Sequence, residues 1–213
     1  MLIEAGSKLI MAGDSVTDCG RGKPEGEGLF GAIGNGYVSF VQAELFARYP
    51  ERRIRVVNMG NSGDTVRALK ARWETDIIEK KPDWVSIMIG INDVWRQYDL
   101  PLETEKHVYL EEYSSTLEEI VSTTKPLLKG MVLMTPYYLE PNANDPMRST
   151  MDKYGAAVKA VAQKYNTYFV DTQAAFNNIL THYHPNMLTW DRVHPNNIGH
   201  MVLTQAFLNA IEF

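Results

Sequence analysis

The stretch KLIMAGDSVTDCGR, from Lys8 to Arg21, decides the fold, because an apolar run ends abruptly in a glycine, an aspartate and a serine. The run KLIMAG (8–13) is short and apolar, as expected of a parallel strand that is buried on both faces. Ser15 then either starts a simple turn or stands as a reactive group at the end of a sheet. The rest of the chain distinguishes these two interpretations.

Four further segments resemble the first in length and composition, and longer segments with helical spacing lie between them. The predicted strands cover residues 8–13, 54–60, 84–90, 131–135 and 167–172. The predicted helices cover residues 37–49, 65–81, 109–125, 147–165 and 197–213. This alternation predicts an α/β fold with a five-stranded parallel sheet and helices on both faces. No repeat or linker divides the chain, so we expect one domain over residues 1–213.

The composition argues against several classes of protein. Of the 213 residues, 45% are hydrophobic and 22% are charged, as in ordinary globular proteins. The net charge of -5, without a cluster of Lys and Arg, predicts no nucleic-acid partner. No apolar stretch approaches the roughly 18 residues of a membrane span, and the N-terminus does not resemble a secretory signal. Together with a single cysteine, Cys19, this favours the cytoplasm and no membrane partner.

Polar, turn-forming residues follow three of the predicted strands at the point where each strand ends. Gly13-Asp14-Ser15 follows the first strand, NMGNSGDT (58–65) the second and GINDVW (90–95) the third. A last polar segment, TWDRVHPNNIGH (189–200), precedes the final helix. Because ligands bind at the carboxyl ends of parallel strands, we expect the functional residues in these segments.

Ser15 is a weak nucleophile unless a base takes its proton and a further group orients that base. His194 lies three residues after Asp191, in a turn stiffened by Pro195. Asp191 can fold back and accept one imidazole N–H, which leaves the other ring nitrogen for Ser15. Alternatively, Asp191 and Asn196 simply cap the final helix, and the spacing alone does not decide between the two.

The other four histidines have ordinary structural interpretations. His107 is expected at the surface near a helix start, and His200 is expected to pack in the core or cap a helix. His182 and His184 share a polar loop, where their spacing alone is a weak signal for a metal pair.

Attack on an ester carbonyl places negative charge on its oxygen, so preorganised N–H donors are required. The candidates are the backbone N–H of Gly60, the side-chain amide of Asn92 and the backbone N–H of Ser15. Gly60 could instead permit a turn with positive φ, and Asn92 could bond its own backbone.

Taken together, four segments resemble the SGNH, or GDSL-type, hydrolase family. They are GDSVTD with Ser15, NMGNSGDT with Gly60, GIND with Asn92, and DRVHPN with Asp191 and His194. The resemblance implies a flavodoxin-like, three-layer α/β/α fold. It also implies that Ser15 is the nucleophile, His194 the base and Asp191 its orienter. Gly60, Asn92 and the Ser15 N–H would form the oxyanion hole.

Two residues depart from the pattern of this family. Val16 stands where a leucine is usual, which several subfamilies tolerate. Arg192 stands where a glycine is common, two residues before His194, so the conformation of that turn is an open question at this stage.

A narrower resemblance rests on GDSVTDCGR, PEGEG, KPDWVSIMIGINDVWRQYD, MTPYY and WDRVHP. These segments look like those of the intracellular bacterial acetylxylan esterases of the same family. The resemblance implies acetylated xylo-oligosaccharide or xylose as substrate, an acetyl-enzyme on Ser15, no cofactor, no metal and a homo-oligomer.

Aromatic residues in the rim loops are candidates for stacking on a sugar. Trp190, Trp95 and Tyr137 are the substrate-binding predictions, with Trp190 favoured because it precedes Asp191. Each could equally fill a gap under the loops or contact another subunit. The Gly-rich segment 19–36 is expected to cover the site or to reach a neighbouring subunit.

Other functions remain to be weighed against the esterase. Asp14, Asp64, Asn92 and Asp93 could hold metals in a phosphoesterase, although GDS and GIND lack the histidines expected there. Asp14 and Asp93 are otherwise expected to hold loops by local hydrogen bonds. A broader carboxylesterase, lipase or thioesterase of the same fold would act on other acyl groups, and a non-catalytic binding module would leave the catalytic residues unused.

Overall fold

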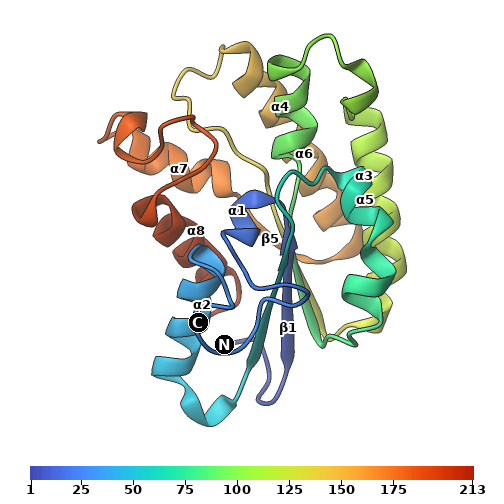
Figure 1. The fold of residues 1–213 in the computed structure, drawn as a ribbon, viewed down its shortest axis with the longest axis vertical. Coiled ribbons are helices and arrows are strands. Elements are labelled where there is room, and N and C mark those ends of the chain that lie inside the picture. The colour runs from blue at the N-terminus through green and yellow to red at the C-terminus, as the bar shows by residue number, and fades with distance from the viewer.

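The computed structural model, which describes residues 1–213, contains one parallel sheet with strand order β2-β1-β3-β4-β5 (Figure 1). The strands are β1 (Lys8–Gly13), β2 (Arg55–Gly60), β3 (Trp84–Met88), β4 (Gly130–Met134) and β5 (Tyr168–Val170). The predicted five-stranded parallel sheet is therefore confirmed. The strand order reverses at β1, which lies between β2 and β3, and this is where ligands bind in such sheets.

Helices cover both faces of the sheet. They are α1 (Ser15–Asp18), α2 (Tyr37–Arg48), α3 (Val66–Ala71), α4 (Ile91–Asp99), α5 (Leu110–Thr124), α6 (Pro146–Tyr165), α7 (Thr172–Leu180) and α8 (Asn197–Ala210). Helices α3, α5 and α6 lie on one side of the sheet, and α2, α7 and α8 lie on the other (Figure 1). No helix has the length and apolar character needed to cross a membrane.

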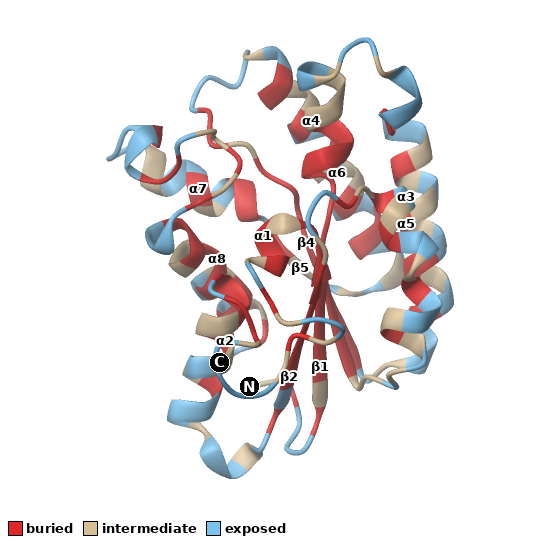
Figure 2. Cartoon of the chain, viewed as in Figure 1, coloured by how far each residue is buried: buried red, intermediate tan, exposed pale blue.

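The two faces of β1 show why its sequence is apolar from Leu9 to Ala12. Ile10 and Ala12 belong to the core on the side of α3, α5 and α6, whereas Leu9 and Met11 belong to the core on the side of α2 and α8. Successive side chains of a strand point to opposite faces, so a strand between two helix layers needs apolar residues at every position. Figure 2 shows the strands buried between the helices.

The structure corrects several predicted helix boundaries. Helices α4 and α7, of nine residues each, were not predicted, and the start of α4 has the pattern of a polar turn after the third strand. The predicted helix over 65–81 is divided into α3 and a π-helical segment, Glu74–Ile78. The division lies at Arg72, whose guanidinium donates to the Asp64 carboxylate and to the carbonyl of Gly13.

The register aligns the ends of three strands at one edge. Gly13, the last residue of β1, pairs with Gly60 of β2 on one side and with Met88 of β3 on the other. The segments after these strands therefore begin side by side, and the chemistry-bearing residues of the sequence gather at this edge.

Candidate active site

Ser15 leaves the sheet through a tight exit from β1. A Cβ atom at Gly13 would lie 2.4 Å from the carbonyl oxygen of Met88, so only glycine fits there. Asp14 caps the following helix, because its Oδ1 accepts a hydrogen bond from the Val16 N–H at 3.0 Å. Ser15 is the first residue of α1, so its N–H has no partner within the helix.

Ser15, His194 and Asp191 form a chain of hydrogen bonds at the carboxyl edge of the sheet. Ser15 Oγ lies 2.8 Å from His194 Nε2, and His194 Nδ1 lies 2.6 Å from Asp191 Oδ2. The carboxylate favours the imidazole tautomer with hydrogen on Nδ1, which leaves Nε2 free to accept the Ser15 proton. Ser15 and His194 are 179 positions apart in the sequence, and the fold brings them into contact.

Asp191 also shapes the turn that carries His194. Its Oδ1 accepts hydrogen bonds from the backbone N–H groups of Val193, at 2.9 Å, and His194, at 2.8 Å. The alternative role as cap of the final helix belongs to Asn196 alone, whose Oδ1 accepts from the Ile198 N–H at 3.0 Å. Asp191 is therefore directed at the imidazole rather than at the helix.

The protonation of Asp191 suits this arrangement. Burial favours the neutral carboxyl, but hydrogen bonds from the side chain and backbone of His194 outweigh burial and lower the pKa of Asp191. An anionic Asp191 stabilises the imidazolium that forms when His194 takes a proton.

The segment after β4 contacts the turn between Asp191 and His194. The Tyr137 hydroxyl donates to the carbonyl of Val193 at 3.0 Å, and the Leu139 N–H donates to the carbonyl of Arg192 at 2.9 Å. The Arg192 guanidinium forms an ion pair with Glu140. Arg192 adopts φ 64°, a left-handed conformation in which glycine is favoured, and these contacts hold the arginine in it.

The prediction that Tyr137 binds substrate is wrong. Its side chain is 1% exposed, and its ring packs against Phe176 with centroids 4.5 Å apart. After β4 the chain packs against the inner side of the turn between Asp191 and His194. The ring of Tyr137 therefore lies in the core and not at the rim. Tyr137 is a structural support for the residues next to His194.

The prediction that Gly60 donates to an oxyanion is also wrong. The Gly60 N–H is already bound to Oδ1 of Asn58 at 2.9 Å. A Cβ atom at Gly60 would lie 2.2 Å from the backbone nitrogen of Asp18. Gly60 is needed for the close approach of α1 to β2, and its φ is not positive.

The next turn contains an N–H group that is free. Asp64 donates its N–H to the carbonyl of Asn61 at 3.2 Å, and Gly63 between them has φ +87° while Ser62 does not have positive φ. These features define a type II turn with glycine at its third position. The N–H groups of Asn61, Ser62 and Asp64 are bound within the protein, whereas that of Gly63 has no intramolecular partner and the residue is exposed.

Asn92 lies beside this turn at the start of α4. Its Nδ2 donates to the carbonyl of Asp64 at 2.9 Å, and its Oδ1 accepts from Nη2 of Arg96 at 3.3 Å. These two bonds fix which way the amide points. One of its two N–H bonds remains unused, so Asn92 retains a donor next to the Gly63 turn.

Each of the two tryptophans near His194 lines a hollow. Trp190, which is 87% exposed, lines a hollow of about 540 Å³ together with Thr189 and His194. Trp95 lines a second hollow of about 400 Å³ with Tyr98. The ring of Trp95 meets that of His194 edge to face, with centroids 5.8 Å apart. Both predicted tryptophans therefore lie at the rim of the site.

Of the other histidines, His200 lies where it was predicted and His107 does not. His200 is buried, as predicted, where its Nδ1 accepts from the Tyr37 N–H at 3.2 Å and its Nε2 lies 3.3 Å from Cys19 Sγ. The thiol of Cys19 is partly buried, and burial raises its pKa. His107 is not at the surface as predicted, because it is buried with its Nε2 donating to the carbonyl of Leu100 at 3.0 Å.

The carboxylates proposed as metal ligands are bound elsewhere. Asp14 caps α1, Asp64 pairs with Arg72 at 2.6 Å, and Asp93 accepts from the Val66 N–H at 3.0 Å. The structure contains no group of three or more His, Cys, Asp or Glu side chains that could hold a metal ion. The local roles predicted for Asp14 and Asp93 are therefore confirmed.

Only part of the Gly-rich segment 19–36 extends away from the molecule. Gly26 pairs with Asn58, and Arg21 Nε donates to the carbonyl of Gly60 at 2.5 Å, so this part is bound to the end of β2. Leu29 and Phe30 at its tip are exposed.

Comparisons with known proteins agree with this geometry. The model of the GDSL-like Lipase/Acylhydrolase family matches residues 11–202. The chain belongs to this family. It is 63% identical to an acetylxylan esterase of Geobacillus stearothermophilus over 213 residues, which is 100% of this chain and 97% of that protein.

Solved structures show the same similarity in three dimensions. The crystal structure of Axe2, an acetylxylan esterase from Geobacillus stearothermophilus, matches with a TM-score of 0.99 at 63% identity, covering 100% of this chain and 97% of that one. Structures of Axe2 include catalytic mutants with a serine, a histidine or an aspartate replaced, at positions 15, 194 and 191 of that chain. LAE5, an alpha/beta hydrolase from the metagenome of Lake Arreo, Spain, matches with a TM-score of 0.98 at 57% identity, covering 100% of this chain and 98% of that one.

Proposed function

We propose that this protein is a serine esterase that removes O-acetyl groups from acetylated xylo-oligosaccharides or xylose. The observation that carries the proposal is the hydrogen-bonded chain from Ser15 through His194 to Asp191, open to solvent beside unused N–H donors. The similarity to an acetylxylan esterase over the full chain supports the choice of substrate.

The reaction begins when Ser15 Oγ attacks the acetyl carbonyl while His194 Nε2 accepts the serine proton. The tetrahedral intermediate collapses to an acetyl-enzyme as its bond to the sugar oxygen breaks, and the imidazolium gives its proton to that oxygen, which leaves as the sugar hydroxyl. Water then attacks the acetyl-enzyme as His194 takes its proton, and the second collapse releases acetate and free Ser15.

The oxyanion of each intermediate needs donors that are already in place. We assign this role to the N–H groups of Ser15 and Gly63 and to the side-chain amide of Asn92. Gly63 replaces Gly60 in this role because the Gly63 N–H is free whereas the Gly60 N–H is bound to Asn58.

The sugar is proposed to lie against the tryptophans that flank His194. Trp190 lines a hollow together with His194, and Trp95 lines a second hollow while its ring meets the imidazole edge to face. Aromatic faces provide apolar area for the carbon-bound face of a sugar ring. A broader carboxylesterase, lipase or thioesterase activity is the alternative, and it predicts faster turnover of longer acyl chains.

Three further features are proposed for the protein as a whole. Residues 1–213 form one catalytic domain, which is supported by the single sheet that contains all five strands. The chain forms a homo-oligomer, which the exposed side chains of Leu29, Phe30 and Trp190 support. We place the protein in the cytoplasm, which cell fractionation tests.

Acetate release from acetylated xylo-oligosaccharides, measured with and without EDTA beside the Ser15→Ala variant, tests the function. We expect release that EDTA does not inhibit and that falls by at least about 1,000-fold in the variant. Retention of p-nitrophenyl acetate hydrolysis without release from the sugar would keep the triad and reject the substrate. Near-normal activity of Ser15→Ala on either ester would reject the mechanism.

A further inference from the structure

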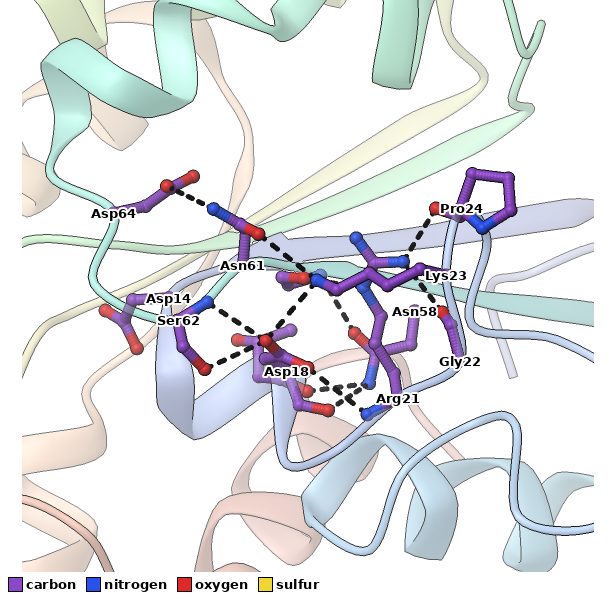
Figure 3. A network of polar contacts seen from close by, with 12 residues as sticks. Asp14, Asp18, Arg21, Gly22, Lys23, Pro24, Asn58, Asn61, Ser62 and Asp64 are labelled. Carbon is purple, nitrogen blue, oxygen red and sulfur yellow. Dashed lines mark hydrogen bonds and ion pairs between the residues drawn. The ribbon is translucent and has the colours of Figure 1, made fainter.

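The carboxylate of Asp18, at the end of α1, is bound to the turn that carries Gly63. Its Oδ2 accepts two hydrogen bonds from Ser62, one from the backbone N–H at 3.0 Å and one from the hydroxyl at 2.8 Å. Figure 3 shows Ser62 directed at this carboxylate. Asp18 is 7% exposed, so the carboxylate that accepts these bonds is buried.

Asp18 is itself held in place by the surrounding backbone. Oδ1 of Asp18 accepts from the Arg21 N–H at 3.2 Å. The side chain of Asn58 donates to the carbonyls of Thr17, at 2.7 Å, and Asp18, at 3.3 Å, which ties the end of α1 to β2. The carboxylate therefore belongs to a rigid unit between two elements of the core, and Figure 3 shows this network beside the turn.

The charge of Asp18 is maintained in this position. Burial favours the neutral acid, but the hydrogen bonds from Ser62 and the charge of Lys23, 3.5 Å away, outweigh it and lower the pKa of Asp18. Hydrogen bonds to an ionised acceptor are about twice as strong as neutral ones, so the anion binds the backbone and hydroxyl of Ser62 strongly.

The hydrogen bonds from Ser62 to Asp18 determine the orientation of the peptide unit between Ser62 and Gly63. Ser62 and Gly63 are the two central residues of a type II turn, and type I and type II turns differ by a flip of the peptide unit between these two residues. A flip would reverse the Gly63 N–H, and Gly63 has the conformational freedom to permit it. Two bonds from the preceding residue to a fixed anion resist this flip.

We propose that Asp18 is a positioning residue for ester hydrolysis, whose carboxylate fixes Ser62 and thereby holds the Gly63 N–H toward the oxyanion. The proposal rests on the esterase function proposed above. Asp18 contacts neither the nucleophile nor the base, so its effect is confined to the stability of the oxyanion in the tetrahedral intermediates.

The test compares Asp18→Ala, Asp18→Asn and Ser62→Ala, with Ser122→Ala on α5 as a matched control whose hydroxyl bonds only the carbonyl of Glu119. Each variant is assayed with p-nitrophenyl acetate. The inhibition constant of a methyl trifluoromethyl ketone is also measured, because this ketone forms a tetrahedral adduct with the serine oxygen. Circular dichroism and thermal unfolding establish that each variant is folded.

We expect Asp18→Ala to lower kcat by about 100-fold, as when one oxyanion donor is lost, and to raise the ketone inhibition constant by a similar factor. The Michaelis constant should change by less than about threefold, because ground-state binding is not affected. Asp18→Asn should recover activity to within about tenfold of the wild type, since its amide oxygen still accepts from Ser62. Ser62→Ala, with one bond removed, should lose about fivefold in both kcat and ketone affinity.

Three results would overturn the role of Asp18. A folded Asp18→Ala variant with wild-type kcat is one, and a loss of kcat without weaker ketone binding is another. If Asp18→Ala does not fold, Ser62→Ala decides, and a ketone inhibition constant equal to that of Ser122→Ala overturns the proposal. A wild-type protein inactive on every ester instead rejects the esterase function, whereas one active on p-nitrophenyl acetate alone rejects only the sugar.

Discussion

Arg192, in the turn that carries His194, forms an ion pair with Glu140 on the segment that follows β4. Arg192 occupies a left-handed conformation with φ 64°, in which glycine is favoured. The ion pair and the Leu139 hydrogen bond thus hold in place a turn that glycine would form without strain. Mutation of Arg192 can separate the effect of the left-handed conformation on stability from the effect of the side-chain contacts.

We expect Arg192→Ala to be about 1 kcal/mol less stable than Arg192→Gly, because both lose the ion pair but only alanine keeps a Cβ atom in the left-handed region. Urea denaturation of the two variants measures the difference. Equal stability, or a less stable glycine variant, would show that the left-handed conformation carries no cost at this position.

We expect Asn92→Ala to lower kcat on p-nitrophenyl acetate by about 100-fold or more, with a smaller change in the Michaelis constant. The reason is that its side-chain amide meets the oxyanion only in the tetrahedral intermediates. Steady-state kinetics test this, with Asn178→Ala on the exposed surface of α7 as the matched control. A loss confined to the Michaelis constant would contradict the oxyanion role.

Replacement of Trp190 by alanine should raise the Michaelis constant for acetylated xylo-oligosaccharides by about tenfold, since an aromatic surface next to the triad is lost. The Michaelis constant for p-nitrophenyl acetate should change much less. Parallel kinetics with the two substrates measure the contrast. Equal changes for both substrates would argue against a sugar contact at this side chain.

The buried His200 should make the protein less stable in acid. Burial, and then the nearby charge of His194, lowers the pKa of His200 from 6.5 to about 4. Between these values the unfolded chain binds a proton that the native protein does not, so the stabilisation present above pH 6.5 is lost as pH falls toward 4. The loss reaches about 3 kcal/mol.

Urea unfolding of the wild type and of His200→Gln between pH 4 and pH 7 tests this. Glutamine can still accept the hydrogen bond from the Tyr37 N–H but does not titrate. The stability difference between the two proteins should therefore change across this range, and a pH-independent difference would contradict the assignment.

Asp93 should make the protein less stable as pH rises, whereas His200 makes it less stable as pH falls. Burial raises the pKa of Asp93 from 3.8 to about 8, so the native protein keeps a proton that the unfolded chain releases. The stabilisation that a protonated Asp93 gives the native protein is fully present below pH 3.8 and is lost as pH rises through about 8. Asp93→Asn should therefore gain stability relative to the wild type as pH rises from 4 to 8, as measured by thermal unfolding. A constant difference between the two proteins over this range would argue against a protonated Asp93.

The sequence alone predicted the strands and their approximate ends, and its resemblance to the SGNH hydrolase family implied the residues of the triad. A strand between two helix layers is mostly apolar on both faces, so runs such as 8–13 and 84–88 are visible without any knowledge of their partners. Asp191 and His194 are close in the sequence, and a nucleophile directly after a strand is marked by its position. These features depend on short-range patterns and on chemistry that few residue types can perform.

The tertiary structure decided which groups are free and which are occupied. Gly60 and Gly63 lie three residues apart in one polar segment, and only the hydrogen bond from Gly60 to Asn58 shows that the first is unavailable. Tyr137 and His107 lie in segments that indicated a rim and a surface, yet both are buried. Tyr137 is covered by contacts with Phe176 and Val193, which are distant from it in the sequence. Availability depends on long-range contacts, because a donor or a ring is exposed only where no other part of the chain covers it. The sequence names the candidate groups, and only the packing around them selects those that can react.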